Sequence, residues 1–443
     1  MKHIISISVL LFILFGYLSG QSNHDGNEYN WAQWRGPNET GVAPSGNPPV
    51  EWSETSHIKW KSDIPGIGHA TPIIWGDQII LLSAVKTDKI GTSENGENPA
   101  NLTAKDYIHK FEVISVDRNS GKIQWQTTVR EELPFFQTHE FGSWASSSPI
   151  TDGENIYANF GSHGIYCLNF HGKILWERDL GRMEKRMDFG EGSSPVLYRD
   201  KLIVLRDHEG QSMLYVMDKT NGKTLWEVKR DEGSSWSTPL VIEYRGSPQL
   251  ITSASNLIRS YDIETGKIIW SCGGLTSNVI PSPVYADGIV YLMSGYRGNA
   301  LLAIDLSKAS GNITGSDAIV WNYGESTTPY TPCPVLKDGK IWFLKANNGY
   351  LTCLDARTGK EYYANQRLDG IRNIFTSPVA VDNRIYIAGT NGSFYVVKAG
   401  TAFEVISQNT LDDNFFASPV IIGNDLFLRG VKALYCVSEE WDL

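Results

Sequence analysis

The sequence predicts an all-β fold, an eight-bladed β-propeller of four-stranded antiparallel blades closed by an N-terminal strand in the last blade. Three observations support this prediction. A short proline motif recurs eight times, the same order of strands and turns follows each copy, and one further strand-like segment precedes the first copy. A period of about 40–50 residues with strand-like content is typical of propeller blades.

The proline motif consists of a small or hydroxyl residue, then proline, then usually an aliphatic residue. After the second copy, successive motif prolines lie 41 to 51 residues apart. Proline suits the first position of a strand, because no ladder N–H is needed there. The eight copies are Thr71-Pro72-Ile73, Ser148-Pro149-Ile150, Ser194-Pro195-Val196, Thr238-Pro239-Leu240, Ser282-Pro283-Val284, Cys333-Pro334-Val335, Ser377-Pro378-Val379 and Ser418-Pro419-Val420.

A constant order of strands and turns follows each motif. A few apolar residues lead to a tight turn such as Asp152-Gly153, and a second alternating strand follows, as at 156–158. A glycine- or asparagine-bearing loop opens a third strand, as at 164–168, and a Thr-Gly turn such as 264–267 opens a fourth. Turn pairs between alternating apolar residues predict hairpins. Each unit is therefore a four-stranded meander, which is one blade.

The aromatic residue of the fourth strand gives a second count. It stands at Trp125, Trp176, Trp226, Trp270, Trp321 and Tyr363, and the seventh copy is reduced to 403–405. The eighth unit begins at Pro419 and has room for only three strands before Leu443, whereas His57–Lys61, with Trp60, matches a fourth strand. We therefore expect this N-terminal strand to complete the last blade, which removes the open edges of the ring.

The remaining segments divide the chain simply. Residues 1–20 resemble a signal peptide, with Lys2 and His3 before the apolar run 4–18 and small residues at 19–20. The alternative is a membrane anchor, but the run is shorter than the ~20 residues needed to span a bilayer. We expect residues 21–51 to form an extended N-terminal arm and residues 52–443 a single propeller. Within it, Lys86–Lys110 is predicted as a long loop and Leu306–Ala318 as a lengthened hairpin.

Charge and cysteine usage narrow the function. The formal net charge is −10 and no block of Lys and Arg occurs, so nucleic acid is excluded as a partner. Three of the five cysteines, Cys167, Cys353 and Cys436, share one third-strand position in distant blades, and we expect free thiols there. A bridge between Cys272 and Cys333 stays open as an alternative.

The segment Asp262–Trp270 resembles the tryptophan-docking repeat of pyrroloquinoline-quinone (PQQ) propellers, and 117–125 and 218–226 are looser copies. Quinone-dependent alcohol dehydrogenases share this repeat with the propeller lipoprotein of the bacterial outer-membrane assembly machine. The resemblance implies the fold and covers nearly the whole chain after residue 20. The adjacent cysteine pair of the dehydrogenases is absent, and no match for their calcium-binding residues is found.

Topology also predicts which loops share a face. The loops before the proline motifs and those between second and third strands lie together, and sites often form where scaffold loops converge. Aromatic, arginine and carboxylate side chains there would suit a sugar or a peptide, but the aromatics could equally plug the ring. The candidate ligand-binding residues on this loop face are His69, Trp144, Asp188, Glu191, Trp236, Arg297, Tyr330 and Arg429.

The sequence therefore predicts an exported binding or scaffold protein without enzymatic activity, periplasmic, cell-surface or secreted, and monomeric. Its loop face would bind a protein, a peptide or a glycan, and no cofactor, catalytic residue or metal ligand is assigned. No HExxH, nucleophile elbow or EF-hand loop occurs. The alternative is an enzyme, either a reduced dehydrogenase that uses PQQ with calcium or a propeller acting on polysaccharide.

Overall fold

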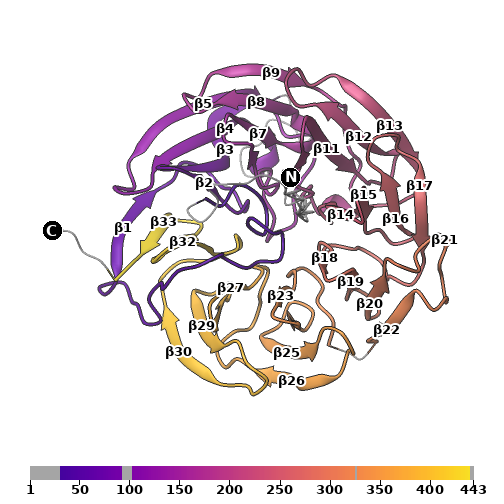
Figure 1. Cartoon of the computed structure of the whole chain (residues 1–443). Helices are drawn as coiled ribbons and strands as arrows, with labels where there is room; N and C mark the ends of the chain where they lie inside the picture. Colours follow the sequence, from indigo (N-terminus) through magenta and orange to yellow (C-terminus); the bar gives the residue numbers. More distant parts are fainter. Residues whose placement is uncertain (1–29, 92–101, 325–326, 440–443) are drawn as a thin grey trace, which may run out of the picture.

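Eight β-sheets surround one axis in a computed structural model, which describes residues 30–91, 102–324 and 327–439 (Figure 1). We number the blades one to eight by their proline motifs. The predicted signal segment 1–20 lies outside the described residues. In the part of the chain that is described, no helix is long or apolar enough to cross a membrane.

The first four proline motifs each open an antiparallel meander of four consecutive strands that runs from the axis outward. Their strands are β2 Ile73–Trp75, β3 Gln78–Ile90, β4 Tyr107–Asp117 and β5 Ile123–Glu132; β6 Ile150–Thr151, β7 Asn155–Asn159, β8 Ile165–Asn169 and β9 Ile174–Arg178; β10 Val196–Tyr198, β11 Lys201–Arg206, β12 Ser212–Asp218 and β13 Thr224–Arg230; β14 Leu240–Tyr244, β15 Ser247–Thr252, β16 Ile258–Asp262 and β17 Ile268–Cys272. Among the described residues, short 3-10 helices lie at Ala104–Asp106, Gly161–His163 and Arg186–Asp188.

The second half repeats the pattern, and its last sheet takes a strand from the N-terminal end. Its strands are β18 Val284–Ala286, β19 Ile289–Ser294, β20 Ala300–Asp305 and β22 Ile319–Asn322; β23 Val335–Lys337, β24 Lys340–Leu344, β25 Tyr350–Asp355 and β26 Glu361–Arg367; β27 Val379–Val381, β28 Arg384–Ala388, β29 Ser393–Lys398 and β30 Val405–Thr410; β31 Val420–Ile422, β32 Asp425–Arg429, β33 Ala433–Val437 and β1 Ile58–Asp63.

Closure by the N-terminal strand is confirmed. Strand β1 pairs antiparallel with β33, with Trp60 opposite Cys436 and Asp63 opposite Ala433. The ring is therefore completed by residues from opposite ends of the chain, and the outer edge of β33 is covered.

Two segments differ from the prediction. Lys86–Lys110 is only partly a loop, because β3 extends to Ile90 and β4 begins at Tyr107, with Lys86 paired to His109. The β3–β4 ladder thus continues past the length of the corresponding strands in the other blades, with a register shift between Lys86 and Ile90.

Blade four is not four-stranded. The lengthened hairpin Leu306–Ala318 contains β21, Gly311–Asn312, which pairs parallel with β17 as a fifth strand. The amide of Ile313 also donates to the carbonyl of Ser271, at 2.9 Å. This insertion therefore fastens blade five to the outer edge of blade four.

Tryptophans of the outer strands join neighbouring blades. Trp60 Nε1 donates to the carbonyl of Arg118 in blade one, and the ring lies so close to Gly121 that a Cβ there would be 2.6 Å from it. Trp125, Trp176, Trp226 and Trp321 repeat this contact on the next blade, with carbonyls of Phe170, Lys219, Ile263 and Ala356. Trp270 is the exception, because the insertion replaces the turn it would meet, and it donates to Gln249 instead.

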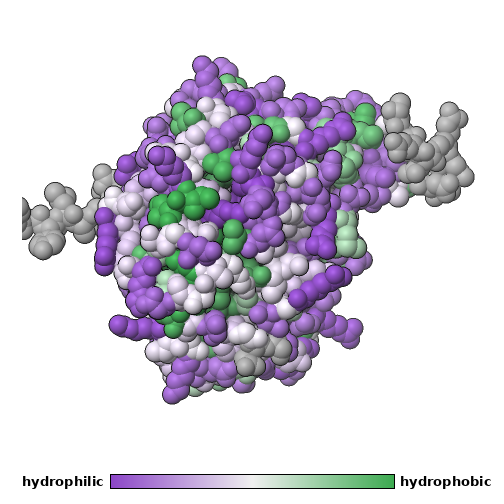
Figure 2. Space-filling view, turned by 90° about the vertical axis from the view of Figure 1, so that its right-hand side faces the viewer, coloured by the Kyte–Doolittle hydropathy of each residue, from purple (hydrophilic) through white to green (hydrophobic). Residues whose placement is uncertain are grey.

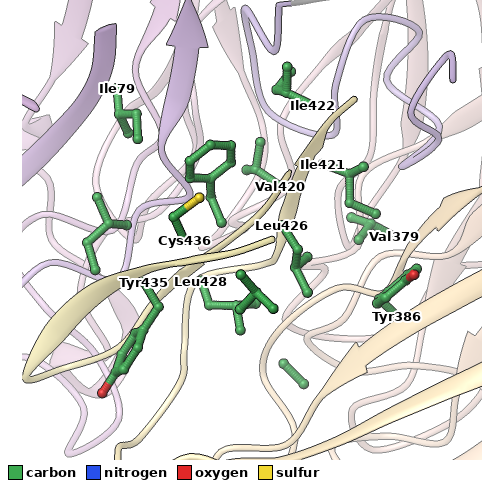
Figure 3. Packing of buried hydrophobic residues seen from close by; sticks show 14 of the residues in the cluster. Ile79, Val379, Tyr386, Val420, Ile421, Ile422, Leu426, Leu428, Tyr435 and Cys436 are labelled. Carbon is green, nitrogen blue, oxygen red and sulfur yellow. The ribbon is translucent and has the colours of Figure 1, made fainter. Parts of the chain in front are cut away.

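The core lies between the sheets, where the faces of adjacent blades interdigitate. The largest cluster joins blades seven, eight and one, and Figure 3 shows Tyr386, Leu426 and Tyr435 within it. All five cysteines are buried free thiols, and Cys272 and Cys333 are not bridged. The outer surface of blades three to five is largely hydrophilic, with scattered hydrophobic patches (Figure 2).

The N-terminal arm crosses the propeller before it reaches β1 (Figure 1). Trp31 forms a bridge with Ile74 in blade one, and Ala43 donates to the carbonyl of Ala380 in blade seven, at 2.8 Å. Trp31 is 1% exposed. The arm is thus part of the packed structure and joins the inner strands of blades one and seven on either side of blade eight.

Candidate functional site

The innermost turn of each blade carries one link of a closed chain of hydrogen bonds. The residue before each motif proline donates its backbone N–H to the side chain of the equivalent residue in the next blade, over 2.8–3.3 Å. The last link runs from Ser418 to Thr71 and closes the circle. We call these residues the hydroxyl ring: Thr71, Ser148, Ser194, Thr238, Ser282, Cys333, Ser377 and Ser418.

The hydroxyl ring explains the motif chemically. A short side chain with an acceptor next to Cβ meets the N–H of the neighbouring blade, while proline starts the strand without a donor of its own. None of the eight donates its own hydrogen to another described group. Those hydrogens are left for whatever occupies the axis.

Residues of the N-terminal arm fill the axis on one side of the hydroxyl ring. Trp34 donates its indole N–H to Ser282, at 3.2 Å, and the guanidinium of Arg35 donates to the carbonyls of Pro334 and Pro378, at 2.5 and 2.8 Å. The cavity left beside them and Glu39 is only about 10 Å³, room for at most one water. Burial raises the pKa of the Glu39 carboxyl to about 8.

On the other side of the ring lies a central cavity of about 400 Å³. All eight residues that stand three positions before the motif prolines line it. Side chains two apart in an extended segment point the same way, so this position faces the axis as the hydroxyl ring does. We call these eight the collar: His69, Ser146, Gly192, Trp236, Ile280, Thr331, Phe375 and Phe416.

Aromatic rings form most of the cavity wall. Phe416 stacks on His69, with ring centroids 4.3 Å apart, and lies 5.9 Å from Phe375. Phe189 lies 6.4 Å from Trp236 on the other side. Loop residues His139, Phe141, Tyr330 and Asn347 complete the lining, with Glu140 and Glu191 as its carboxylates.

His69 is a neutral acceptor in this wall. Its Nδ1 lies 3.1 Å from the carbonyl of Phe141, which can only accept, so Nδ1 carries the hydrogen. Burial, with the nearby positive charge of Arg429, lowers the pKa of His69 to about 4. Its Nε2 therefore stays unprotonated at neutral pH.

A side pocket of about 40 Å³ adjoins the central cavity between blades two and three. The two share Ser146, Glu191 and Gly192. Glu191 accepts from both the backbone N–H and the hydroxyl of Ser162. Lys185, also in the lining, donates to the carbonyls of Asp207 and Ser235, and burial lowers its pKa to about 8.

The predicted residues divide among these places. His69, Glu191, Trp236 and Tyr330 line the central cavity, and Trp144 and Asp188 line the side pocket.

Arg297 and Arg429 line neither cavity. Arg297 lies against Tyr296, 5.3 Å from its ring centroid. Arg429 is 3% exposed and donates to the carbonyls of Ala70 and Leu82, because the end of β32 directs it between blades eight and one. Its place gives it a structural role.

Sequence reasoning also placed Phe375 and Phe416 on the loop face but did not include them among the candidate ligand-binding residues, and it missed Ile280. All three stand at the same offset from proline as His69 and Trp236, and this offset would have identified the whole collar. Trp34 and Phe141 lie outside the repeat and had no such signal. Among the described residues, no group of three or more His, Cys, Asp or Glu side chains could hold a metal ion.

Comparisons with known proteins agree with the fold. A family model described as outer membrane protein assembly factor BamB matches residues 109–361 and 214–439. A tetrathionate hydrolase from Acidithiobacillus ferrooxidans is 20% identical over 361 residues, which are 76% of this chain and 66% of that protein. The match thus spans just under two thirds of the length of this curated relative.

Solved structures are similar at low identity. BamB from Moraxella catarrhalis superposes with a TM-score of 0.51 at 14% identity, over 81% of this chain and 99% of that one. A europium-containing methanol dehydrogenase superposes with a TM-score of 0.64 at 12% identity, over 92% and 91%. At these identities the likeness concerns the fold alone.

Proposed function

This chain belongs to the family described as outer membrane protein assembly factor BamB, and from that premise we propose that it is a binding protein without enzymatic activity whose central cavity takes the ligand. The ligand is a protein, a peptide or a glycan. We further propose that the chain is exported, to the periplasm, cell surface or exterior, and acts as a monomer.

One observation carries the proposal. The collar occupies one structural position in eight blades, yet it presents partly exposed aromatic side chains such as Trp236, Phe375 and Phe416 to a cavity instead of packing them away. Apolar walls with a few convergent polar groups are the usual make-up of a ligand pocket. The aromatic wall therefore supports a binding role more than an axial plug.

The alternative is an enzyme that uses PQQ, and the charges of this cofactor can be compared with those of the residues that line the central cavity. PQQ carries three carboxylates, whereas the described lining of the central cavity contains Glu140 and Glu191 and no Lys or Arg. A carboxylate taken into a partly desolvated cavity needs a cationic partner. These residues therefore do not fit the quinone, and the same lack of lining cations disfavours an anionic substrate such as tetrathionate.

A binding screen with matched variants tests the proposal. Trp236→Ala and Phe375→Ala each remove a wall side chain, and we expect at least a tenfold loss of affinity for the partner found by pull-down or on peptide and glycan arrays, with little change in melting temperature. Arg297→Ala, outside both cavities, is the control. Unchanged affinity in both wall variants would refute a site in the cavity, and turnover of any captured ligand would favour the enzyme.

A further inference from the structure

The collar has a gap at Ser146 and Gly192. These are its smallest members, they come from adjacent blades, and the side pocket opens between them. Across the cavity, Phe375 and Phe416 of blades seven and eight lie 5.9 Å apart with their rings tilted by 45°. The cavity thus has an aromatic wall on one side and, on the other, a narrow recess with the Glu191 carboxylate in its lining.

The floor of the cavity is rich in hydrogen-bonding groups that are neutral. Seven members of the hydroxyl ring line it, from Thr71 round to Ser377, and none donates its hydrogen to another described residue. His69 adds an acceptor through Nε2. A ligand that lies flat on the aromatic wall and carries several hydroxyls would satisfy both kinds of surface.

The charges around the cavity favour a neutral ligand. The charge of Glu191 is balanced, since Lys185 and Arg206 both interact electrostatically with it from behind the wall. Glu140 is exposed to solvent, so a cation would find only this screened carboxylate, and an anion would find no Lys or Arg among the described residues of the central lining. Neither sign of charge is therefore well accommodated.

The cavity is also blind. Trp34 and Arg35 fill the axis beyond the hydroxyl ring and leave about 10 Å³ there. A polymer cannot pass through the ring, so only the end of a chain can reach the floor.

From these features we infer that the central cavity binds the terminal ring of a neutral oligosaccharide, with one face of the sugar on Phe375 and its edge toward Phe416, its hydroxyls on the hydroxyl ring, and one substituent in the gap beside Glu191. The inference rests on the proposed binding function and names the ligand of that same cavity. A volume of about 400 Å³ lies at the small end of ligand pockets, which suits one ring and its linkage.

Intrinsic fluorescence provides the assay, because Trp34 and Trp236 both line the cavity. The probes are neutral linear oligosaccharides of hexoses, pentoses and N-acetylated sugars, a cyclic glucan that has no terminal ring, a uronate oligomer and a lysine-rich peptide. We expect saturable binding of at least one neutral linear oligosaccharide, and none of its cyclic or charged counterparts.

A pair of glycine variants tests the gap. A Cβ at Gly192 would meet only Trp236, at 3.6 Å, and one at Gly233 only Glu209, also at 3.6 Å. Both sites therefore have room next to the backbone, but only Gly192→Val fills the gap. We expect Gly192→Val to weaken oligosaccharide binding roughly tenfold or more, and Gly233→Val to leave it unchanged.

Each outcome is decisive. Binding of the cyclic glucan as tightly as a linear one, or equal affinities in the two glycine variants, overturns this inference. Binding of the peptide alone, lost in Phe375→Ala, overturns it while leaving the proposed function intact. Binding of no probe overturns it too, and the pull-down with wall variants then decides the proposed function separately.

Discussion

The hydroxyl ring and the collar are built by the same eight segments, two residues apart, and both face the propeller axis. At the first position stand five serines, two threonines and one cysteine. At the second stand histidine, serine, glycine, tryptophan, isoleucine, threonine and two phenylalanines. The residue type is nearly uniform at the first position and differs in almost every blade at the second, although the local backbone is the same.

The difference shows what each position is for. The hydroxyl ring must supply an acceptor to the neighbouring blade in every link, so only short side chains with oxygen or sulfur serve. Collar side chains form no such repeated link, although single members such as His69 and Trp236 contact neighbouring segments, so their type can vary with what lies in the cavity. Within a repeat, the position that breaks the repeat is the better guide to a site.

The largest effect should follow from removing the segment that closes the ring. Deleting residues 30–63 removes β1 and the arm, exposes the edge of β33 and takes away the buried Trp31, Trp52 and Trp60. Loss of one such side chain typically costs about 3–5 kcal/mol. We expect aggregation or a large fall in melting temperature, measured by light scattering and calorimetry. A monomeric deletion variant of unchanged stability would contradict closure.

Breaking a single link of the hydroxyl ring should cost less but still be measurable. Ser148→Ala leaves the N–H of Thr71 buried and unpaired, and we expect a loss of about 1–3 kcal/mol in denaturant unfolding. The adjacent Ser147 is also buried, but its hydroxyl has no hydrogen-bond partner in the described structure. Ser147→Ala is therefore the matched control, and equal losses in the two variants would deny the ring a stabilising role.

A smaller, pH-dependent effect on stability is expected from Glu39, which lies on the arm side of the hydroxyl ring. The pKa of Glu39 is raised to about 8 from 4.5, so its carboxyl is neutral in the folded state at low pH and destabilises that state as pH rises from about 4.5 to 8. Glu39→Gln cannot ionise. We expect it to stabilise the protein by about 1–3 kcal/mol at pH 8 and by much less at pH 4.5. A benefit independent of pH would show that Glu39 titrates normally.

The smallest effect should come from making the ring uniform. Cys333→Ser replaces the sulfur that accepts from Ser282 at 3.2 Å with a better acceptor, and we expect a gain below about 1 kcal/mol. Cys353→Ser is the contrasting control, because it places a hydroxyl in an apolar cluster and should destabilise by about 1–3 kcal/mol. An equal change in stability of the two variants in thermal unfolding would contradict the distinction between the hydroxyl ring and the core.

Periodicity decided what could be predicted. The blades, their number and the closing strand with Trp60 followed from residues that recur. His69, Trp236, Glu191 and Tyr330 were predicted because they stand beside the recurring proline, at positions whose direction the turn sets.

The rest depended on information that no repeat carries. The direction of the Arg429 side chain depends on the pleat at the end of β32. A register shift of one residue there decides whether a side chain faces the cavity or the core between two blades. Trp34 reaches the axis through an arm that belongs to no blade. The pairing of Lys86 with His109 depends on how far a hairpin ladder continues, which composition alone does not set.

The joining of β1 to β33 also imposes an order of events on the newly made chain. Ile58 is synthesised long before its partner Val437, so the first strand stays unpaired until the intervening blades have been made. Contacts of such long sequence separation slow folding and leave strand edges open to wrong partners meanwhile. The complete ring, with its cavity, therefore comes into existence in one late step, after the last blade has emerged, and no earlier fragment of the chain can hold a finished site.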